Sequence, residues 1–201
     1  MRVVLDTASL IKRTAHERAS LIGLVESLSE IQASYKPSPN IWSVNENLEH
    51  LALAEIYGVS RIWSAADGVR IGKPVWVGEH TNRGLSIDEI IARTWKPCEI
   101  APPGSTPRIG GPMLYWVEQL RVSQLVLNRL ESVLDGADLE SIIFPHFISG
   151  PLDAVQRIDF LRFHIARHRS QIDQMMSSPE FPKIEEGQTE EGRETEEGQT
   201  N

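Results

Sequence analysis

Apolar residues recur three or four positions apart in four long stretches of the chain. This spacing is the period of an amphipathic helix, and it predicts helices near residues 6–32, 43–65, 113–134 and 151–176. Alternation with a period of two, which would indicate a strand, is confined to residues 75–77. Four long helices joined by loops predict an all-α fold, an antiparallel four-helix bundle.

Capping and breaking residues mark the ends of these helices. Ser43 precedes Glu46 by three positions, which is the spacing of a capping box at the start of the second helix. A similar Ser-Ile-Asp-Glu start predicts a short helix over residues 86–95. Residues 97–112 contain five prolines and three glycines and are expected to form a loop. Pro151 favours the first turn of the last helix.

The formal net charge of −8 is unevenly spread. Residues 183–201 hold seven glutamates against one lysine and one arginine, and they lack aromatic residues. Such a segment buries too little surface to offset its ordering entropy. We therefore expect one domain over residues 1–178 and a disordered acidic tail over 179–201. The remaining chain is mildly acidic, which excludes the basic footprint that nucleic-acid binding requires.

The chain has the features of a cytoplasmic protein. No apolar run approaches the roughly 18 residues that a membrane span needs, so no membrane partner is expected. The N-terminal apolar stretch is too short for a secretory signal. Cys98 is the only cysteine, so an intrachain disulfide is impossible, and we interpret it as an idle loop thiol.

Candidate chemistry lies in three histidines. His164 and His168 are four residues apart, so they stack on one face of the last helix, close to Leu161. Two imidazoles in a core are costly unless a metal ion or separate hydrogen bonds use their lone pairs. This spacing alone leaves surface histidines as the alternative. His50 lies on the flank of the second helix, where a residue facing a neighbouring helix would lie.

The order and spacing of these motifs resemble the DinB-like family over about residues 6–177. The first motif is Trp42-Ser43, Glu46, Leu48, His50-Leu51 and Glu55, and the second is His164, His168 and Gln171-Ile172. A third stretch, Pro145-His146 followed by Gly150-Pro151-Leu152, has the family's His and Pro in reverse order, which leaves the role of His146 open.

The resemblance implies that His50, His164 and His168 bind one divalent transition metal, Zn, Ni, Fe or Mn, with open positions for water or substrate. It implies a metal-dependent thiol-S-transferase or hydrolase acting on a small electrophile, with a low-molecular-weight thiol as a partner. Known members also include a maleylpyruvate isomerase of the mycothiol type. Family habit further suggests a homodimer. The catalytic residues stay unknown, and Glu55 is interpreted as an orienter of His50 or as a member of a salt bridge.

The alternative function is a non-catalytic stress-related or ligand-binding bundle with a structural or adventitious metal. An accessible cleft above the metal favours the enzyme, whereas a site closed by Trp42, Phe160 and Phe163 favours the module. The other candidate residues are expected to be structural or solvated. We expect His16 and His80 to be exposed, the arginines at 162, 167 and 169 to face solvent, and the tryptophans at 63, 76, 95 and 116 to pack in the core.

Overall fold

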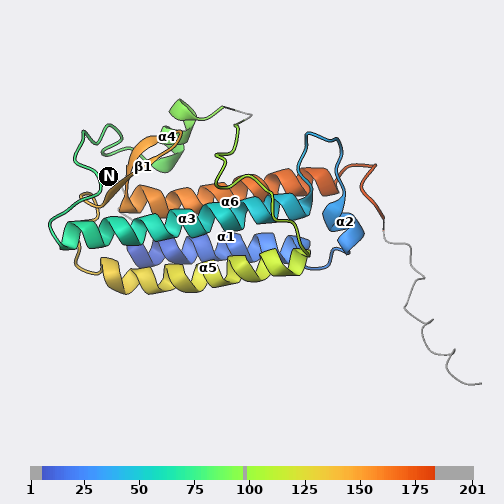
Figure 1. Cartoon of the computed structure of the whole chain (residues 1–201), viewed down its shortest axis with the longest axis horizontal. Coiled ribbons are helices and arrows are strands. Elements are labelled where there is room, and N and C mark those ends of the chain that lie inside the picture. The colour runs from blue at the N-terminus through green and yellow to red at the C-terminus, as the bar shows by residue number, and fades with distance from the viewer. Residues whose placement is uncertain (1–5, 97–98, 184–201) are drawn as a thin grey trace, which may run out of the picture.

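Four long helices lie side by side in the computed structural model, which describes residues 6–96 and 99–183 (Figure 1). The elements in chain order are α1 (Thr7–Val25), α2 (Glu30–Ser34), α3 (Val44–Arg70), α4 (Ile87–Thr94), α5 (Met113–Leu134), β1 (Ile143–His146), β2 (Gly150–Asp153) and α6 (Ala154–Met176). The all-α four-helix bundle is therefore confirmed, with one small antiparallel hairpin added. The acidic segment from residue 184 onward lies outside the described residues.

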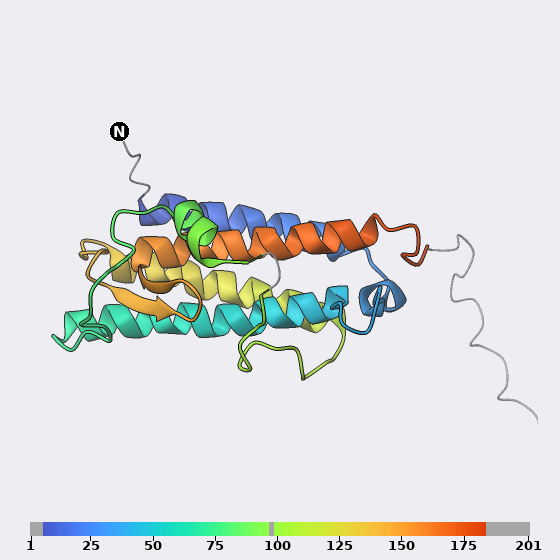
Figure 2. The same ribbon diagram turned by 90° about the horizontal axis from the view of Figure 1, so that it is seen from above.

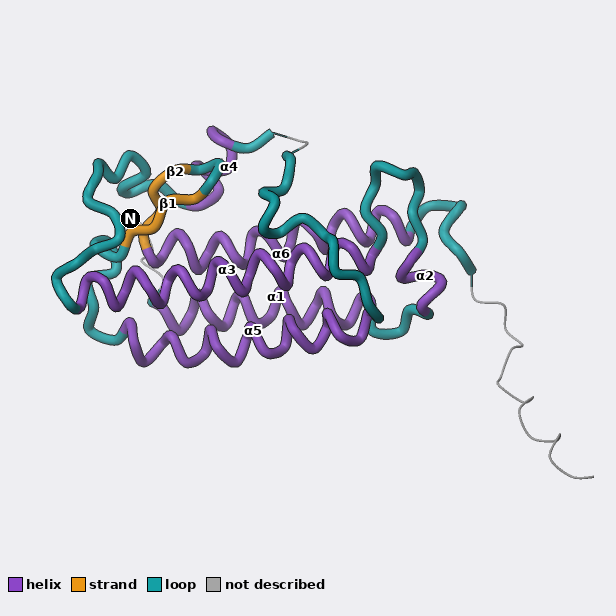
Figure 3. The backbone as a smooth tube through the Cα atoms, in the orientation of Figure 1, coloured by secondary structure: helices purple, strands orange, loops and turns teal. Residues whose placement is uncertain are grey.

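The helix directions explain the longest connection in the chain. α1 and α6 run in one direction along the bundle, and α3 and α5 run in the other (Figure 1). α1 packs mainly on α6 and α3 mainly on α5, while α3 also packs on α6 and α1 on α5. Because α3 and α5 are consecutive long helices that run in the same direction, the chain between them must return along the bundle. It does so through α4 and the loop after it, over the α3–α6 side (Figures 2 and 3).

A buried ion pair lies inside the largely apolar interior of the bundle. Arg18 of α1 donates to Glu55 of α3 over 2.7 Å, and the two side chains are 2% and 1% exposed. Glu55 therefore belongs to a salt bridge and does not orient His50. The apolar core around the pair includes Leu21, Val25, Leu48, Leu51, Val59, Ile62, Trp116, Leu120, Leu127, Leu130, Ile158, Ile165 and Ile172.

The helix predicted over residues 6–32 is in fact two helices. α1 ends at Val25, and α2 starts at Glu30 after a capping box in which Ser29 and Gln32 bond to each other's backbone N–H groups. A serine side chain that caps a new helix competes with continuation of the old one, which apolar periodicity cannot reveal. α3 extends beyond the predicted residue 65, and Gly72, with a φ of 72°, follows its end.

The last helix begins three residues later than predicted, because a hairpin precedes it. β1 pairs with β2 in the register Phe144 with Leu152, and Pro151 lies in the strand rather than in a first helical turn. Asp153 caps α6 through a capping box with Gln156. The strands are only four residues long, too short for a period of two to stand out.

The packed chain reaches beyond the expected domain boundary at residue 178. Phe181 is buried, and its ring lies edge-on to Tyr35 at 5.6 Å. Gln32 donates to the carbonyl of Pro182 over 2.9 Å. These contacts fasten the segment after α6 onto α2. Within the described part of the chain, no helix has the length and apolar character to cross a bilayer.

Candidate metal centre

His50, His164 and His168 converge at the interface between α3 and α6. The Nε2 atom of His164 lies 3.1 Å from that of His50 and 3.2 Å from that of His168. The three residues are only 5–7% exposed. The four-residue spacing on α6 stacks two of the rings, and the packing of α3 against α6 brings His50 onto them. Among the described residues, this trio is the one group of histidine, cysteine or acidic side chains close enough to hold a metal ion.

Hydrogen bonds on the far side of two rings fix their tautomers. Nδ1 of His50 donates to the carbonyl oxygen of Ser105 over 2.8 Å, and Nδ1 of His168 donates to Oδ1 of Asn47 over 2.8 Å. The orientation of the Asn47 amide is itself fixed, because its Nδ2 donates to the carbonyls of Trp42 and Ser43. With the proton on Nδ1, the Nε2 atoms of both histidines present lone pairs to the centre.

This donor set fits a divalent transition metal. If His164 carries a proton on Nε2, it can direct that proton at one neighbouring lone pair, and the other remains buried without a donor. Burial lowers the pKa of His50 and, more strongly, the pKa values of His164 and His168, and neighbouring imidazoles lower the pKa of His164 further. The rings are thus held neutral, as ligation requires. Two nitrogens bound to a tetrahedral metal at about 2.0–2.1 Å lie about 3.3 Å apart, close to the observed separations.

Glu49 holds the loop after α4 over this centre. The described part of that loop, residues 99–112, is called the return segment below. The Glu49 carboxylate accepts backbone N–H groups from Arg108, Ile109 and Gly110 at 2.6, 2.7 and 3.0 Å. The side chain is buried on α3, next to His50 in sequence. The same segment carries Ser105, so the carboxylate and the histidine bind two parts of one loop. The predicted loop at 97–112 is therefore a structural part of the site. Its first two residues, Pro97 and Cys98, lie outside the described part of the chain.

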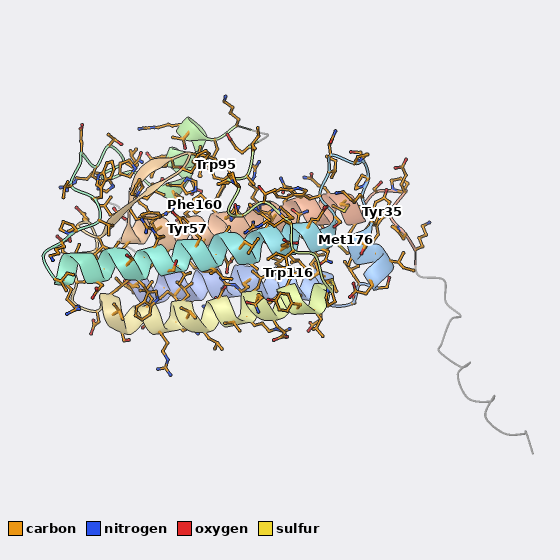
Figure 4. All side chains as sticks on the ribbon, viewed as in Figure 1. Tyr35, Tyr57, Trp95, Trp116, Phe160 and Met176 are labelled. Atoms are coloured by element: carbon orange, nitrogen blue, oxygen red, sulfur yellow. The ribbon has the colours of Figure 1, made fainter. Side chains whose placement is uncertain are left out.

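A cleft of about 1370 Å³ opens above the histidines, along the groove between α3 and α6. All three histidines line it, together with Trp42, which stacks on His168, and Trp95, which lies edge-on to His164. Figure 4 shows Tyr57, Phe160 and Trp95 on the side of the bundle that the hairpin and α4 cover, whereas Trp116 lies between α3 and α5. The aromatic residues form walls of an open cleft and do not close the site.

The hairpin end of the cleft holds His146 and two arginines that the sequence analysis did not single out. Arg61 and Arg157 line it and contact the ring of Phe144. His146 packs on Phe160, and its Nδ1 accepts the backbone N–H groups of Ile148 and Ser149. Burial, assisted by Arg157, lowers the pKa of His146 to about 3.

The remaining expectations divide between confirmation and correction. His16 is exposed, as expected, but the side chain of His80 is only 3% exposed, because it lies against Gln156 at the start of α6. Trp116 is a core residue, whereas Trp95 is a wall of the cleft. Arg162 pairs with Asp159 and Arg169 with Glu17, while Arg167 lies over Trp95 within the cleft.

Comparison with known families agrees with this geometry. A family model described as the DinB superfamily matches residues 13–172, well over half of the chain. The chain belongs to the DinB superfamily. All three histidines lie within the matched range. A search of curated proteins and a search of solved structures each found no match.

DinB membership and the histidine trio together fit a metal-dependent protein. The resemblance that the sequence motifs indicated is thereby confirmed for the family and for the all-α fold. These two findings identify neither the metal nor the reaction.

Proposed function

We propose that this DinB protein is a metal-dependent enzyme that transfers a low-molecular-weight thiol to a small electrophilic substrate. The observation that carries the proposal is the position of the three histidines, whose Nε2 lone pairs meet in the wall of a large cleft. A structural metal site is normally closed by four protein ligands, whereas three ligands beside an open space are typical of catalysis.

The chain's own residues hold and orient the ligand groups. Asn47 and Ser105 keep the ring protons of His168 and His50 on Nδ1, on the side away from the centre. Trp42 and Trp95 give the cleft apolar walls that exclude water from a bound electrophile. A bound divalent metal supplies Lewis acidity, which lowers the pKa of a thiol or water and polarises an electrophile.

The scarcity of carboxylates favours a thiol over water as the nucleophile. Among the described residues that line the cleft, Glu99 is the sole carboxylate, and it accepts the backbone N–H of Lys96. No carboxylate therefore stands out as a general base for hydrolysis. A thiol has a reference pKa of about 8.5 and needs far less help than water to lose its proton. Hydrolysis remains the second reaction to test.

Metal analysis of untagged protein, followed by an activity screen, tests the proposal. We expect about one divalent ion per chain in the wild type and loss of that ion in His50→Ala, His164→Ala and His168→Ala. His16→Ala, which removes an exposed histidine, should keep the ion. The metal-loaded wild type should conjugate a low-molecular-weight thiol to a chlorinated aromatic electrophile, and His164→Ala should not.

A different result would favour the non-catalytic module. If the wild type binds metal but no thiol or ester reacts faster than with His164→Ala, the enzyme proposal is wrong and the ligand-binding alternative stands. If His16→Ala and His164→Ala hold the same amount of metal, the ion does not reside at the three histidines.

A further inference from the structure

Two arginines at the hairpin end of the cleft have no anionic partner among the described residues. Arg157, in the first turn of α6, is only 6% exposed. Arg61, on α3, is half-buried. The Nε atom of each is buried and makes no hydrogen bond. Both guanidinium groups lie against an aromatic ring: their central carbons are 4.5 Å (Arg61) and 4.3 Å (Arg157) from the centre of the Phe144 ring.

No negative charge among the described residues balances the positive charges of Arg61 and Arg157. The pKa of Arg157 is lowered to about 9, chiefly by burial; Tyr57 acts against this lowering, and the charge of Arg61 contributes to it. Arg157 is still a cation at neutral pH. The first turn of α6 adds the positive end of a helix dipole. A buried guanidinium normally has a carboxylate or several hydrogen-bond acceptors, because its desolvation is otherwise costly.

We propose that Arg61 and Arg157 form an oxyanion subsite, which binds a carboxylate or phosphate group of the ligand. Guanidinium groups bind both kinds of oxyanion through paired hydrogen bonds, and both arginines line the cleft that contains the histidines. The subsite stands independently of any metal. The statement that the rest of the ligand reaches the histidines rests on the proposed function.

The helix register sets the size of that ligand. Arg157 precedes His164 by two helical turns on α6, and Arg61 follows His50 by three turns on α3. Each pair lies on one face of its helix. At 1.5 Å per residue, these separations correspond to about 10 Å and about 16 Å along the helices. The substrate class is therefore an elongated electrophile with an anionic group at the end remote from its reactive atom.

Binding of small anions tests the subsite without any enzymatic assay. The unfolding temperature of metal-free protein is measured in a zwitterionic buffer while inorganic phosphate or glutarate replaces chloride at constant ionic strength. The variants are Arg157→Met and Arg61→Met, with Arg169→Met as the control that removes one charge from the same helix outside the cleft. His50→Ala is included because an anion cannot bind it through a metal held by the three histidines.

We expect at least one of the two anions to stabilise the wild type, His50→Ala and Arg169→Met with similar dissociation constants. Arg157→Met and Arg61→Met should bind that anion about tenfold more weakly or worse, because a charge-assisted pair is lost. Without anion, Arg157→Met should unfold at the same temperature as the wild type or higher, since an unpartnered buried charge has been removed. The better of phosphate and glutarate identifies the kind of oxyanion.

Three results would overturn the subsite. One is that neither anion stabilises the wild type. Another is that Arg157→Met and Arg61→Met respond like Arg169→Met. The third is that Arg157→Met loses stability while Arg61→Met binds the anion normally, which would make the pair a packing device around Phe144. Arg157→Lys provides the same test if the methionine variant does not fold, because lysine keeps the charge but not the paired hydrogen bonds.

Discussion

Asn47 orients one histidine of the candidate metal centre without belonging to the trio. Its amide is held by two backbone carbonyls, and its oxygen accepts the Nδ1 proton of His168. The proton on Nδ1 leaves Nε2 free to face His164. Groups that orient a ligand in this way raise its basicity and fix its ring, so their loss weakens metal binding even when every ligand remains.

Replacement of Asn47 by leucine should therefore lower metal affinity about 10–100-fold. The fold should survive, at a cost of about 1–3 kcal/mol for the lost hydrogen bonds at the start of α3. Competition titration with a metal indicator measures the affinity. Asn45→Leu is the matched control, because Asn45 donates to the carbonyl of Gly111 and bonds to no histidine in the described part of the chain. Equal affinities for Asn47→Leu and the wild type would show that the tautomer is not set by Asn47.

The grouping of the three candidate ligand residues was largely predictable from sequence, and the residues that orient them were not. A spacing of four on an amphipathic helix places His164 and His168 on one face whatever surrounds them. Asn47 sits three residues before His50, but nothing in the local pattern shows which partner its amide meets across the bundle. Arg157 was overlooked for a related reason, because its burial depends on a hairpin that the sequence pattern did not reveal.

At the scale of elements, the parallel course of α3 and α5 determines what covers the site. The chain must travel back along the bundle between them, and Glu49 captures this return segment with three backbone hydrogen bonds. Asn45 and Trp116 add bonds to Gly111 and Gly110 at the end of the segment. The loop is therefore attached at several points, and its proline content limits the entropy that attachment costs.

Substitution of Glu49 by glutamine should loosen this segment. The glutamine amide keeps one acceptor oxygen, but an N–H₂ group replaces the other. That group is a donor and faces a backbone N–H, which is also a donor, so at least one of the three backbone hydrogen bonds is lost. We expect a loss of about 1–3 kcal/mol in the free energy of unfolding. Protease cleavage within residues 99–112 should become faster. Denaturant titration and limited proteolysis measure the two effects.

An exposed glutamate provides the control for Glu49. Glu131→Gln on α5 removes the same charge from the surface and should change the unfolding free energy by less than about 0.5 kcal/mol. If Glu49→Gln resists protease as well as Glu131→Gln does, the carboxylate is not what holds the return segment.

The elements themselves were largely predictable because long amphipathic helices have a strong period. The start of α5 and the capped start of α4 follow from local residues. The break between α1 and α2 and the hairpin before α6 depend instead on side-chain caps and on pairing between short strands. The helical spacing of apolar residues continues through both segments, so that spacing alone predicted helix in each.

At the scale of the whole molecule, the two sides of the bundle differ. Residues of α3 and α6 line the cleft, and the hairpin and the return segment lie on the same side of the bundle, whereas no element of the described chain covers the outer face of α5 (Figure 1). That face has an exposed apolar stripe, formed by Tyr115, Val122, Leu125, Val126 and Val133 at 40–65% exposure. Exposed apolar stripes of this kind mark interaction surfaces. We propose that a second copy of this chain covers it, as the family habit suggests.

The residues along α5 are complementary to themselves about a two-fold axis. If two α5 helices pack antiparallel with the axis between positions 123 and 124, Val122 of one copy faces Leu125 of the other. The same axis places Glu118 opposite Arg129, and by symmetry this pair occurs twice. Both charged residues are exposed in the single chain. An interface of this type is isologous, with an apolar centre and a charged rim.

A charge swap tests this arrangement at the level of the assembly. Light scattering at micromolar concentration should give the wild type twice the chain mass of 22.6 kDa. Arg129→Glu places like charges opposite each other twice and should shift the protein toward monomer. The double variant Glu118→Arg with Arg129→Glu restores opposite charges and should recover the dimer. Ile31→Glu, at a 75% exposed apolar position on α2, should remain dimeric. A monomeric wild type would refute the dimer, and a double variant no better than Arg129→Glu would refute this register, because only residues paired across the axis can compensate each other.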